Sequence, residues 1–123
     1  MNMKFVIVLS AFLVFCAAVE LYSTENDHLD IEAVVSDPTT LKAFLDCFND
    51  KGSCDEQMAD FKKDIPEVVM ENCAKCTKAQ KHILKRFLEE IKVKKPDDYQ
   101  VFKQKYDPQD KNFAALEAAI ANS

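Results

Sequence analysis

Four cysteines carry the most specific spacing in this sequence. Cys47, Cys54, Cys73 and Cys76 follow the pattern C-x6-C-x18-C-x2-C. A fifth cysteine, Cys16, would leave with the signal peptide described below. The even number that remains in a short exported chain indicates disulfides, and four cysteines allow three pairings. We favour Cys47–Cys54 and Cys73–Cys76, because each pair joins neighbours across one turn. Residues three apart on a helix lie roughly 5 to 6 Å from each other, which is within disulfide reach.

Two other cysteine chemistries are possible. Cys73-Ala-Lys-Cys76 could be a redox pair, with Lys75 lowering the pKa of a thiol. Redox C-x-x-C pairs usually lie beside a βαβ unit, and this sequence has no such pattern, so a structural disulfide is favoured. A four-cysteine zinc site fits less well, because a six-residue spacing is not that of a zinc knuckle. We therefore expect neither a metal nor a cofactor.

Nothing else in the sequence suggests catalysis. His28 and His82 are the only histidines, and neither belongs to a catalytic triad or a zinc motif. The carboxylates are scattered over expected solvent faces, and a single glycine excludes nucleotide-binding glycine loops. With 16 basic against 21 acidic residues, the net charge of −5 makes nucleic acid a poor candidate partner. We expect a protein that is not an enzyme.

The N-terminal segment has the features of a secretory signal peptide. Lys4 precedes a mostly apolar run from Phe5 to Phe15, and the small residues Cys16-Ala17-Ala18 follow. The run is shorter than the ~20 residues that a membrane-spanning helix needs, and no later segment resembles a span. We expect residues 1–18 to be the signal peptide and residues 19–123 to form one secreted domain.

The remaining sequence predicts an all-α domain, because apolar residues recur at three-and-four spacing and strict alternation is scarce. Asp30 can cap a short helix over Ile31, Val34 and Val35. Asp37-Pro38 predicts the start of a second helix, which Gly52 would end by supplying a positive φ. A third helix would begin at Asp55, and Pro66 would interrupt it before a restart over residues 68–70.

The strongest helix prediction follows Thr77 and Gln80, which form a capping-box pair ahead of a long apolar stripe. The charged residues on its other face are expected to be solvated. Pro96 opens a further helix that ends at Asp107-Pro108, and an alanine-rich helix covers residues 113–121. The result is a compact bundle of six or seven short helices, without a linker long enough to separate domains.

At this point the sequence resembles a known family, the insect chemosensory or OS-D-like proteins. The cysteine spacing is that family's signature. Three further motifs support it: Asp50-Lys51-Gly52, Lys75-Cys76-Thr77 with Gln80, and Lys105-Tyr106-Asp107-Pro108. The resemblance covers essentially all of the mature chain. It implies six helices around an apolar channel, the two local disulfides, and reversible binding of hydrophobic molecules such as long-chain alcohols, acids and esters.

Two positions depart from the family pattern. The family commonly has a tyrosine near the start of the mature chain that helps to close the channel, whereas alignment places Asn26 there and Tyr22 four residues earlier. The family also often has a tryptophan after the proline that opens the fifth helix. This chain has no tryptophan, and Tyr99 takes that place.

The apolar stripes have two interpretations. By themselves they are typical of a filled core, and the family resemblance favours a binding cavity instead. Tyr99 and Tyr106 could each offer a hydroxyl to a ligand head group or leave it in water. The residues expected to line the cavity are Leu41, Phe44, Leu45, Phe48, Phe61, Ile65, Val69, Ile83, Leu84, Phe87, Leu88, Ile91, Tyr99, Phe102 and Tyr106.

The functional expectation is a secreted, monomeric carrier that binds apolar small molecules, including semiochemicals, and performs no catalytic step. Burial of about ten methylenes at ~0.8 kcal/mol each offers roughly 8 kcal/mol before the costs of association. Micromolar affinity is therefore reachable without a specific polar contact. The alternative is a secreted helical protein with a filled core that acts through a surface contact with another protein.

Overall fold

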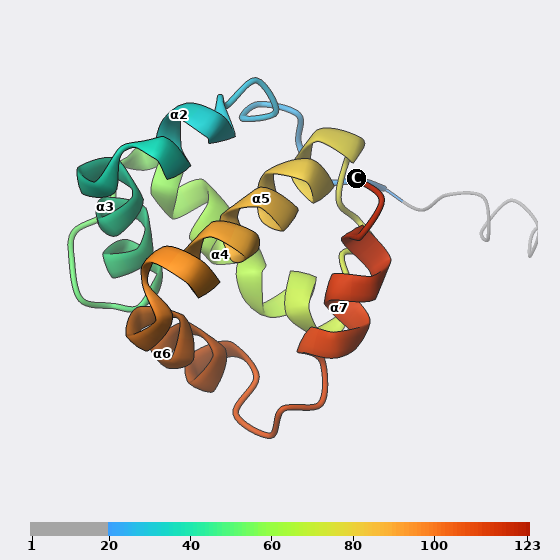
Figure 1. Ribbon diagram of the computed structural model, residues 1–123. Coiled ribbons are helices and arrows are strands. Elements are labelled where there is room, and N and C mark those ends of the chain that lie inside the picture. The colour runs from blue at the N-terminus through green and yellow to red at the C-terminus, as the bar shows by residue number, and fades with distance from the viewer. Residues whose placement is uncertain (1–19) are drawn as a thin grey trace, which may run out of the picture.

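The computed structural model describes residues 20–123 as six helices, α2 to α7, with no strand in that range (Figure 1). The all-α prediction is confirmed. The segment predicted to be a signal peptide lies outside the described residues. Within the described part of the chain, no helix combines the length and the apolar character needed to span a membrane.

The first two helices begin where their caps were predicted. α2 covers Ile31–Ser36, and the Asp30 side chain accepts a hydrogen bond from the Ala33 N–H. α3 covers Pro38–Phe48, and the Asp37 side chain accepts one from the Thr39 N–H. Each aspartate satisfies a backbone donor that has no partner within the first helical turn.

The prediction that Gly52 supplies the positive φ after α3 is wrong. Asp50 adopts it, with φ of 61°. Lys51 N–H donates to the Asp46 carbonyl and Asp50 N–H to that of Cys47, so the helix ends in a Schellman motif. Gly52 serves a different purpose: a Cβ at that position would lie 3.1 Å from the Asp46 Cβ. Gly52 therefore eases a close approach to Asp46 and does not serve a left-handed conformation.

The predicted interruption at Pro66 is also wrong, because α4 runs without a break from Glu56 to Met70. Proline removes the hydrogen bond that its own nitrogen would make to the carbonyl four residues earlier. Pro66 lies on the exposed face of α4, whereas Ile65 and Val69 are buried. Packing of the buried face holds the helix together where the local sequence favours a break.

The last three helices match their predicted positions closely. α5 covers Lys78–Lys94, and both hydrogen bonds of its Thr77–Gln80 capping box are present. α6 covers Pro96–Tyr106 and α7 covers Phe113–Ile120. Between them, the buried Asp107 carboxylate accepts hydrogen bonds from the Asn112 and Phe113 N–H groups, so it also positions the start of α7.

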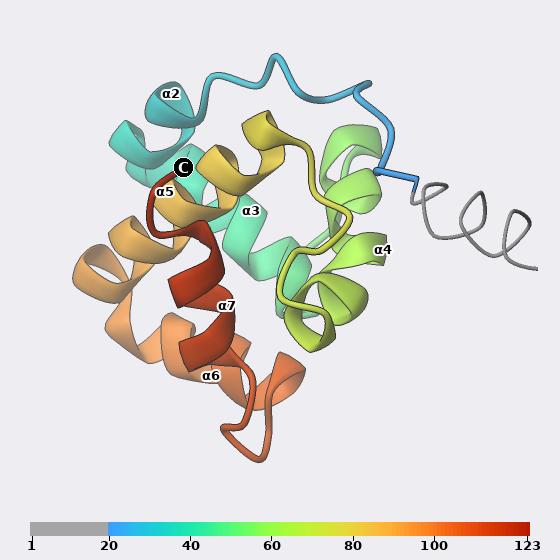
Figure 2. The same cartoon turned by 90° about the vertical axis from the view of Figure 1, so that its right-hand side faces the viewer.

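α4 and α5 each pack against other helices of the bundle and have few close backbone contacts with each other. α5 packs against α2, α6 and α7, while α3 packs against α2, α4 and α6. The α4 backbone has close contacts with α3, α6 and α7 but few with α5. In Figure 2, α4 lies on the right and α5 on the left, and the residues before α2 cross the top between them.

Both predicted disulfides are present, which confirms the pairing. Cys47–Cys54 joins the end of α3 to the residue before the α4 cap, and its Cα atoms are 5.1 Å apart. Cys73–Cys76 lies in the connection between α4 and α5, with Cα atoms 5.0 Å apart. Both bridges are local, so they fix two corners of the bundle without tying its far ends together.

Candidate functional site

An apolar cavity of about 90 Å³ lies between α4 and α5 and is partly open to solvent. α4 and α5 supply half of its sixteen lining residues, and α2, α3, α6, the segment before α2 and the second disulfide supply the rest. Its lining residues are Tyr22, Leu29, Ile31, Phe44, Phe48, Phe61, Asp64, Ile65, Val68, Cys73, Cys76, Gln80, Ile83, Leu84, Phe87 and Phe102.

Eight of the residues expected from the sequence lie on this wall: Phe44, Phe48, Phe61, Ile65, Ile83, Leu84, Phe87 and Phe102. They come from α3, α4, α5 and α6, so helices that are distant in sequence contribute to one surface. Their contact with a ligand stays a prediction, since the geometry alone gives the shape of the cavity and not its occupant.

Seven expected residues do not line the cavity: Leu41, Leu45, Val69, Leu88, Ile91, Tyr99 and Tyr106. All but Tyr106 are buried in the packed core. A helix of a small bundle buries a stripe that is wider than any one cavity, so part of each stripe packs against neighbouring helices. The spacing of apolar residues in the sequence is the same for those that line the cavity and those that pack in the core, so it does not distinguish them.

Neither tyrosine of α6 places its hydroxyl in the cavity. Tyr106 donates its hydroxyl to the Phe48 carbonyl at 2.7 Å. Tyr99 packs against Phe113, and the Lys92 ammonium lies 5.6 Å from the centre of its ring. Burial raises the pKa of both phenols above the ordinary value. Both rings therefore serve the core beside the cavity.

Four phenylalanines form one end of the cavity. Phe48 contacts Phe44 and Phe87 edge to face, with ring centres 6.1 and 5.6 Å apart. Phe87 in turn contacts Phe102 in the same manner at 6.2 Å. Such edge contacts stabilise aromatic clusters beyond the area that they bury. This end of the wall presents ring surfaces and no hydrogen-bonding group.

The segment before α2 covers another side of the cavity, and Tyr22 is its principal contact. The Tyr22 N–H donates to the Lys75 carbonyl at 2.8 Å, and its hydroxyl donates to Glu67 at 2.6 Å. Burial, followed by the Glu67 hydrogen bond, raises the pKa of Tyr22 above its usual range. The same hydrogen bond lowers the pKa of Glu67. At neutral pH the pair is thus a phenol donating to a carboxylate.

Asn26, which occupies the family's tyrosine position in the alignment, does not reach the cavity. Its side chain donates to Asp60 at 3.3 Å and accepts from Gln57 at 3.4 Å, both on α4. Tyr22 lines the cavity instead. The covering segment therefore places a tyrosine side chain on the cavity wall four positions before Asn26.

Sequence reasoning did not assign eight lining residues to the cavity: Tyr22, Leu29, Ile31, Asp64, Val68, Cys73, Cys76 and Gln80. Asp64 is the most informative of them, because it is a half-buried carboxylate on an apolar wall. Burial raises its pKa, and the charge of Lys63 opposes that rise. The sequence spacing indicates this position, because Asp64 lies three residues after Phe61 and four before Val68 and therefore shares a face of α4 with them.

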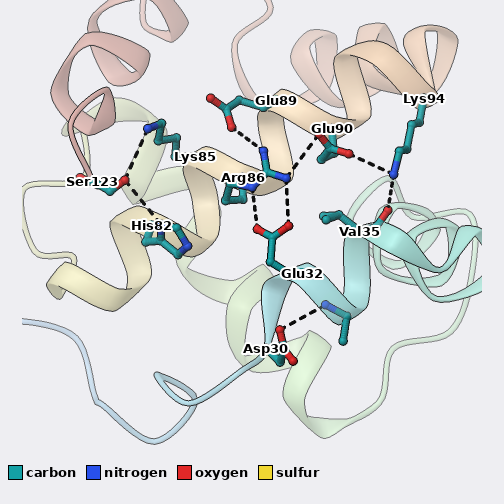
Figure 3. Close-up of polar contacts among 11 residues, drawn as sticks. Asp30, Glu32, Val35, His82, Lys85, Arg86, Glu89, Glu90, Lys94 and Ser123 are labelled. Carbon is teal, nitrogen blue, oxygen red and sulfur yellow. Dashed lines mark hydrogen bonds and ion pairs between the residues drawn. The ribbon is translucent and has the colours of Figure 1, made fainter.

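Ion pairs hold α2 against α5 at the side of the cavity (Figure 3). The Arg86 guanidinium of α5 donates two hydrogen bonds to the Glu32 carboxylate of α2, at 2.6 and 3.0 Å. It donates a third to Glu89, at 2.8 Å. Lys94 donates to the Val35 carbonyl at the end of α2. A two-pronged arginine contact fixes orientation as well as distance. α2 thereby holds Ile31 in place on the cavity wall.

The described residues offer little for catalysis. Within residues 20–123, no group of three or more metal-ligating side chains gathers. Cys73 and Cys76 are bonded to each other and buried, so Lys75 has no thiol to activate. His82 is exposed and lies near the Ser123 carbonyl (Figure 3). What the site offers chemically is an apolar volume with a few polar groups at its edges.

Two known proteins are similar to this chain over about three quarters of its length. The chain is 27% identical to ejaculatory bulb-specific protein 3 of Drosophila melanogaster over 78% of its length and 76% of that protein. It is 30% identical to allergen Tha p 1 of Thaumetopoea pityocampa over 73% and 71% of the two chains.

A solved structure described as a chemosensory protein in complex with bromo-dodecanol has the same fold. The TM-score is 0.72 at 21% identity, and the match covers 79% of this chain and 97% of that one. Residues 22–114, the whole region that forms the cavity, match a family signature. The chain belongs to the insect pheromone-binding family, A10/OS-D.

Proposed function

We propose that this protein is a carrier that reversibly binds apolar small molecules in the cavity between α4 and α5. The observation that carries the proposal is the cavity wall itself, which is apolar apart from Tyr22, Asp64 and Gln80. The related fold with bromo-dodecanol bound supports the same conclusion, because that ligand is a long apolar chain with one polar end.

The size of the cavity determines how a ligand would enter. Its volume of about 90 Å³ is small beside the roughly 300 to 1,000 Å³ of pockets that enclose drug-sized ligands. A long chain therefore needs the wall to move outward. The two disulfides do not prevent this movement. Each closes a short local loop, and neither links α4 to the central part of α5.

The free energy available from burial is sufficient. Each methylene removed from water contributes about 0.8 kcal/mol, and ten of them contribute roughly 8 kcal/mol before association costs. Opening of the cavity and ordering of the ligand reduce this sum. Affinities near the micromolar range follow, with selectivity set by length and shape.

The natural setting that we propose is an extracellular fluid. The apolar segment before the domain predicts secretion, and a monomer without catalytic activity would carry poorly soluble alcohols, acids, esters or semiochemicals through water. The exposed large apolar residues within the described part of the chain, Leu21, Met70 and Val93, lie on separate segments.

A displacement titration tests the proposal. The disulfide-bonded protein is mixed with a fluorescent apolar probe, and dodecanol is then added. Probe uptake that dodecanol reverses with a stoichiometry of one supports the carrier function. Absence of probe uptake by the folded protein, together with no heat of binding for dodecanol, would favour action through a surface contact instead.

A further inference from the structure

Among the described residues, Asp64 is the one polar side chain on the cavity wall that makes no hydrogen bond. Tyr22 already donates its hydroxyl to Glu67. Gln80 accepts from the Thr77 N–H at 3.0 Å and donates to the Ser23 carbonyl at 2.8 Å. Asp64 has neither a hydrogen bond nor an ion pair with any other residue of the range 20–123.

The position of Asp64 makes its lack of a partner significant. Phe61 precedes it by three residues and Val68 follows it by four, and all three lie on the cavity wall. Neither Asp64 oxygen is among the buried polar atoms of the described residues that lack a partner, so both are accessible to water or to a ligand. An ionised carboxylate has acceptor atoms only, so the group that would satisfy it must be a donor.

We propose that Asp64 is the acceptor for the polar end of the ligand, and that the protein therefore prefers long apolar chains bearing a hydroxyl or an ammonium over those bearing a carboxylate. This inference rests on the proposed carrier function. A hydroxyl or an ammonium supplies the donor that Asp64 lacks, whereas an ionised acid adds a second negative charge and no donor.

The charges around Asp64 strengthen the discrimination. Asp60 and Glu67 lie on the same helix, and both make the surroundings of Asp64 more negative. The neighbouring cations already pair with these two residues: Lys63 lies 3.6 Å from Asp60, and Lys75 lies 3.6 Å from Glu67. Within residues 20–123, a carboxylate ligand would find these two cations already paired with other carboxylates.

The test compares ligands that share a chain and differ in their polar end. Dodecanol, dodecylamine and dodecanoate each displace the fluorescent apolar probe from the disulfide-bonded protein near neutral pH. We expect dodecanol and dodecylamine to bind about tenfold more tightly than dodecanoate, which is the range of one hydrogen bond to a charged group. Equal affinities for all three would overturn the assignment of Asp64.

Asp64→Asn isolates the charge, because it keeps the shape of the side chain. The preference for dodecanol over dodecanoate should fall to about twofold or less in this variant. Glu56→Gln is the matched control: it removes one negative charge from the exposed start of α4, eight residues or about 12 Å along the helix from Asp64, and should keep the preference.

The possible results separate the two proposals. If dodecanol displaces the probe and Asp64→Asn leaves the preference unchanged, the head-group assignment is wrong and the carrier function stands. If no dodecyl compound displaces the probe from the unsubstituted protein, both proposals fail. A preference that falls equally in Asp64→Asn and Glu56→Gln would also count against Asp64, because it would reflect overall charge.

Discussion

Tyr22 donates its hydroxyl to the Glu67 carboxylate at 2.6 Å and thereby joins two residues that lie 45 positions apart. The contact ties the segment before α2 to α4, on the far side of the cavity from the point where Arg86 holds α2 to α5. Between these two points Asn26 bonds to Asp60 and Gln57 of α4, and the Ser23 carbonyl accepts from Gln80 of α5, so the covering segment is bonded to both helices that flank the cavity. Opening the cavity at this side requires some of these hydrogen bonds to break, and the Tyr22–Glu67 bond is the shortest of those that the covering segment makes.

Tyr22→Phe should therefore speed ligand exchange. The variant keeps the ring against the cavity and loses only the hydroxyl that binds Glu67. Stopped-flow release of a fluorescent probe should be several times faster than from the unsubstituted protein. Tyr106→Phe is the control, because it also loses one hydroxyl bond, to the Phe48 carbonyl, but Tyr106 does not line the cavity, so the release rate should stay unchanged. Equal release rates for Tyr22→Phe and the unsubstituted protein would show that this hydrogen bond does not limit exchange.

Filling the cavity should weaken binding without unfolding the protein. Val68→Phe adds ring volume to the wall at a partly buried position of α4. We expect the affinity for dodecanol to fall by about tenfold, because the added ring competes for the space that the ligand needs. Val93→Phe makes the same change at a position that is 78% exposed and should leave the affinity unaltered. A calorimetric titration of both variants checks this, and equal affinities for the two would place the ligand elsewhere.

Core and cavity residues should respond differently to truncation. Leu45 is fully buried and does not line the cavity, so Leu45→Ala should lower the free energy of unfolding by about 2 to 5 kcal/mol. Leu84 lines the existing cavity and is only partly buried, so Leu84→Ala should cost less and enlarge the binding volume. Urea denaturation measures both. A larger loss for Leu84→Ala than for Leu45→Ala would contradict the division between packed core and cavity wall.

The sequence predicts local features of the fold, such as helix caps, but not which buried residues line the cavity. The caps at Asp30, Asp37 and Thr77 are local, because each side chain binds a backbone group two or three residues away, and all three were predicted correctly. The division between cavity wall and packed core depends on which helices face each other. Leu45 and Leu84 both belong to apolar stripes, and nothing in either stripe distinguishes them.

The two wrong local predictions have the same cause. Pro66 lies in an unbroken helix because its buried neighbours hold α4 against the bundle. Asp50 takes the left-handed position that Gly52 was expected to occupy, and its carboxylate is bound by Lys62 and Lys105 from α4 and α6. In each case tertiary contacts outweigh the preference of the local sequence, and a single sequence does not reveal those contacts.

The Asp50 contacts also predict a pH dependence. Hydrogen bonds from Lys105 and then Lys62 lower the pKa of Asp50 to about 2. Because this value lies below the ~3.9 of an unfolded aspartate, the contribution of Asp50 to stability is complete above about pH 4 and is lost as the pH falls toward 2. Asp50→Asn tolerates the same backbone conformation and removes the charge. Its melting temperature should lie below that of the unsubstituted protein at pH 6, and the difference should shrink by pH 2.

A double-mutant cycle provides the control for this pH prediction. In a Lys105→Met background, Asp50→Asn should have a smaller effect on the melting temperature at pH 6, because one of the two ammonium groups that bind Asp50 is gone. If the difference in melting temperature between the unsubstituted protein and the Asp50→Asn variant stays constant from pH 6 to pH 2, the carboxylate charge does not contribute.

The central claim is that an apolar chain occupies the space between α4 and α5, and intermolecular nuclear Overhauser effects test it most directly. With dodecanol bound to methyl-labelled protein, the account predicts contacts from the ligand chain to the methyl groups of Ile31, Ile65, Val68, Ile83 and Leu84, which line the cavity. It predicts none to Leu116 or Ile120, which are buried in α7. Ligand contacts confined to surface methyl groups such as that of Met70, with none to Ile83 or Leu84, would contradict the account.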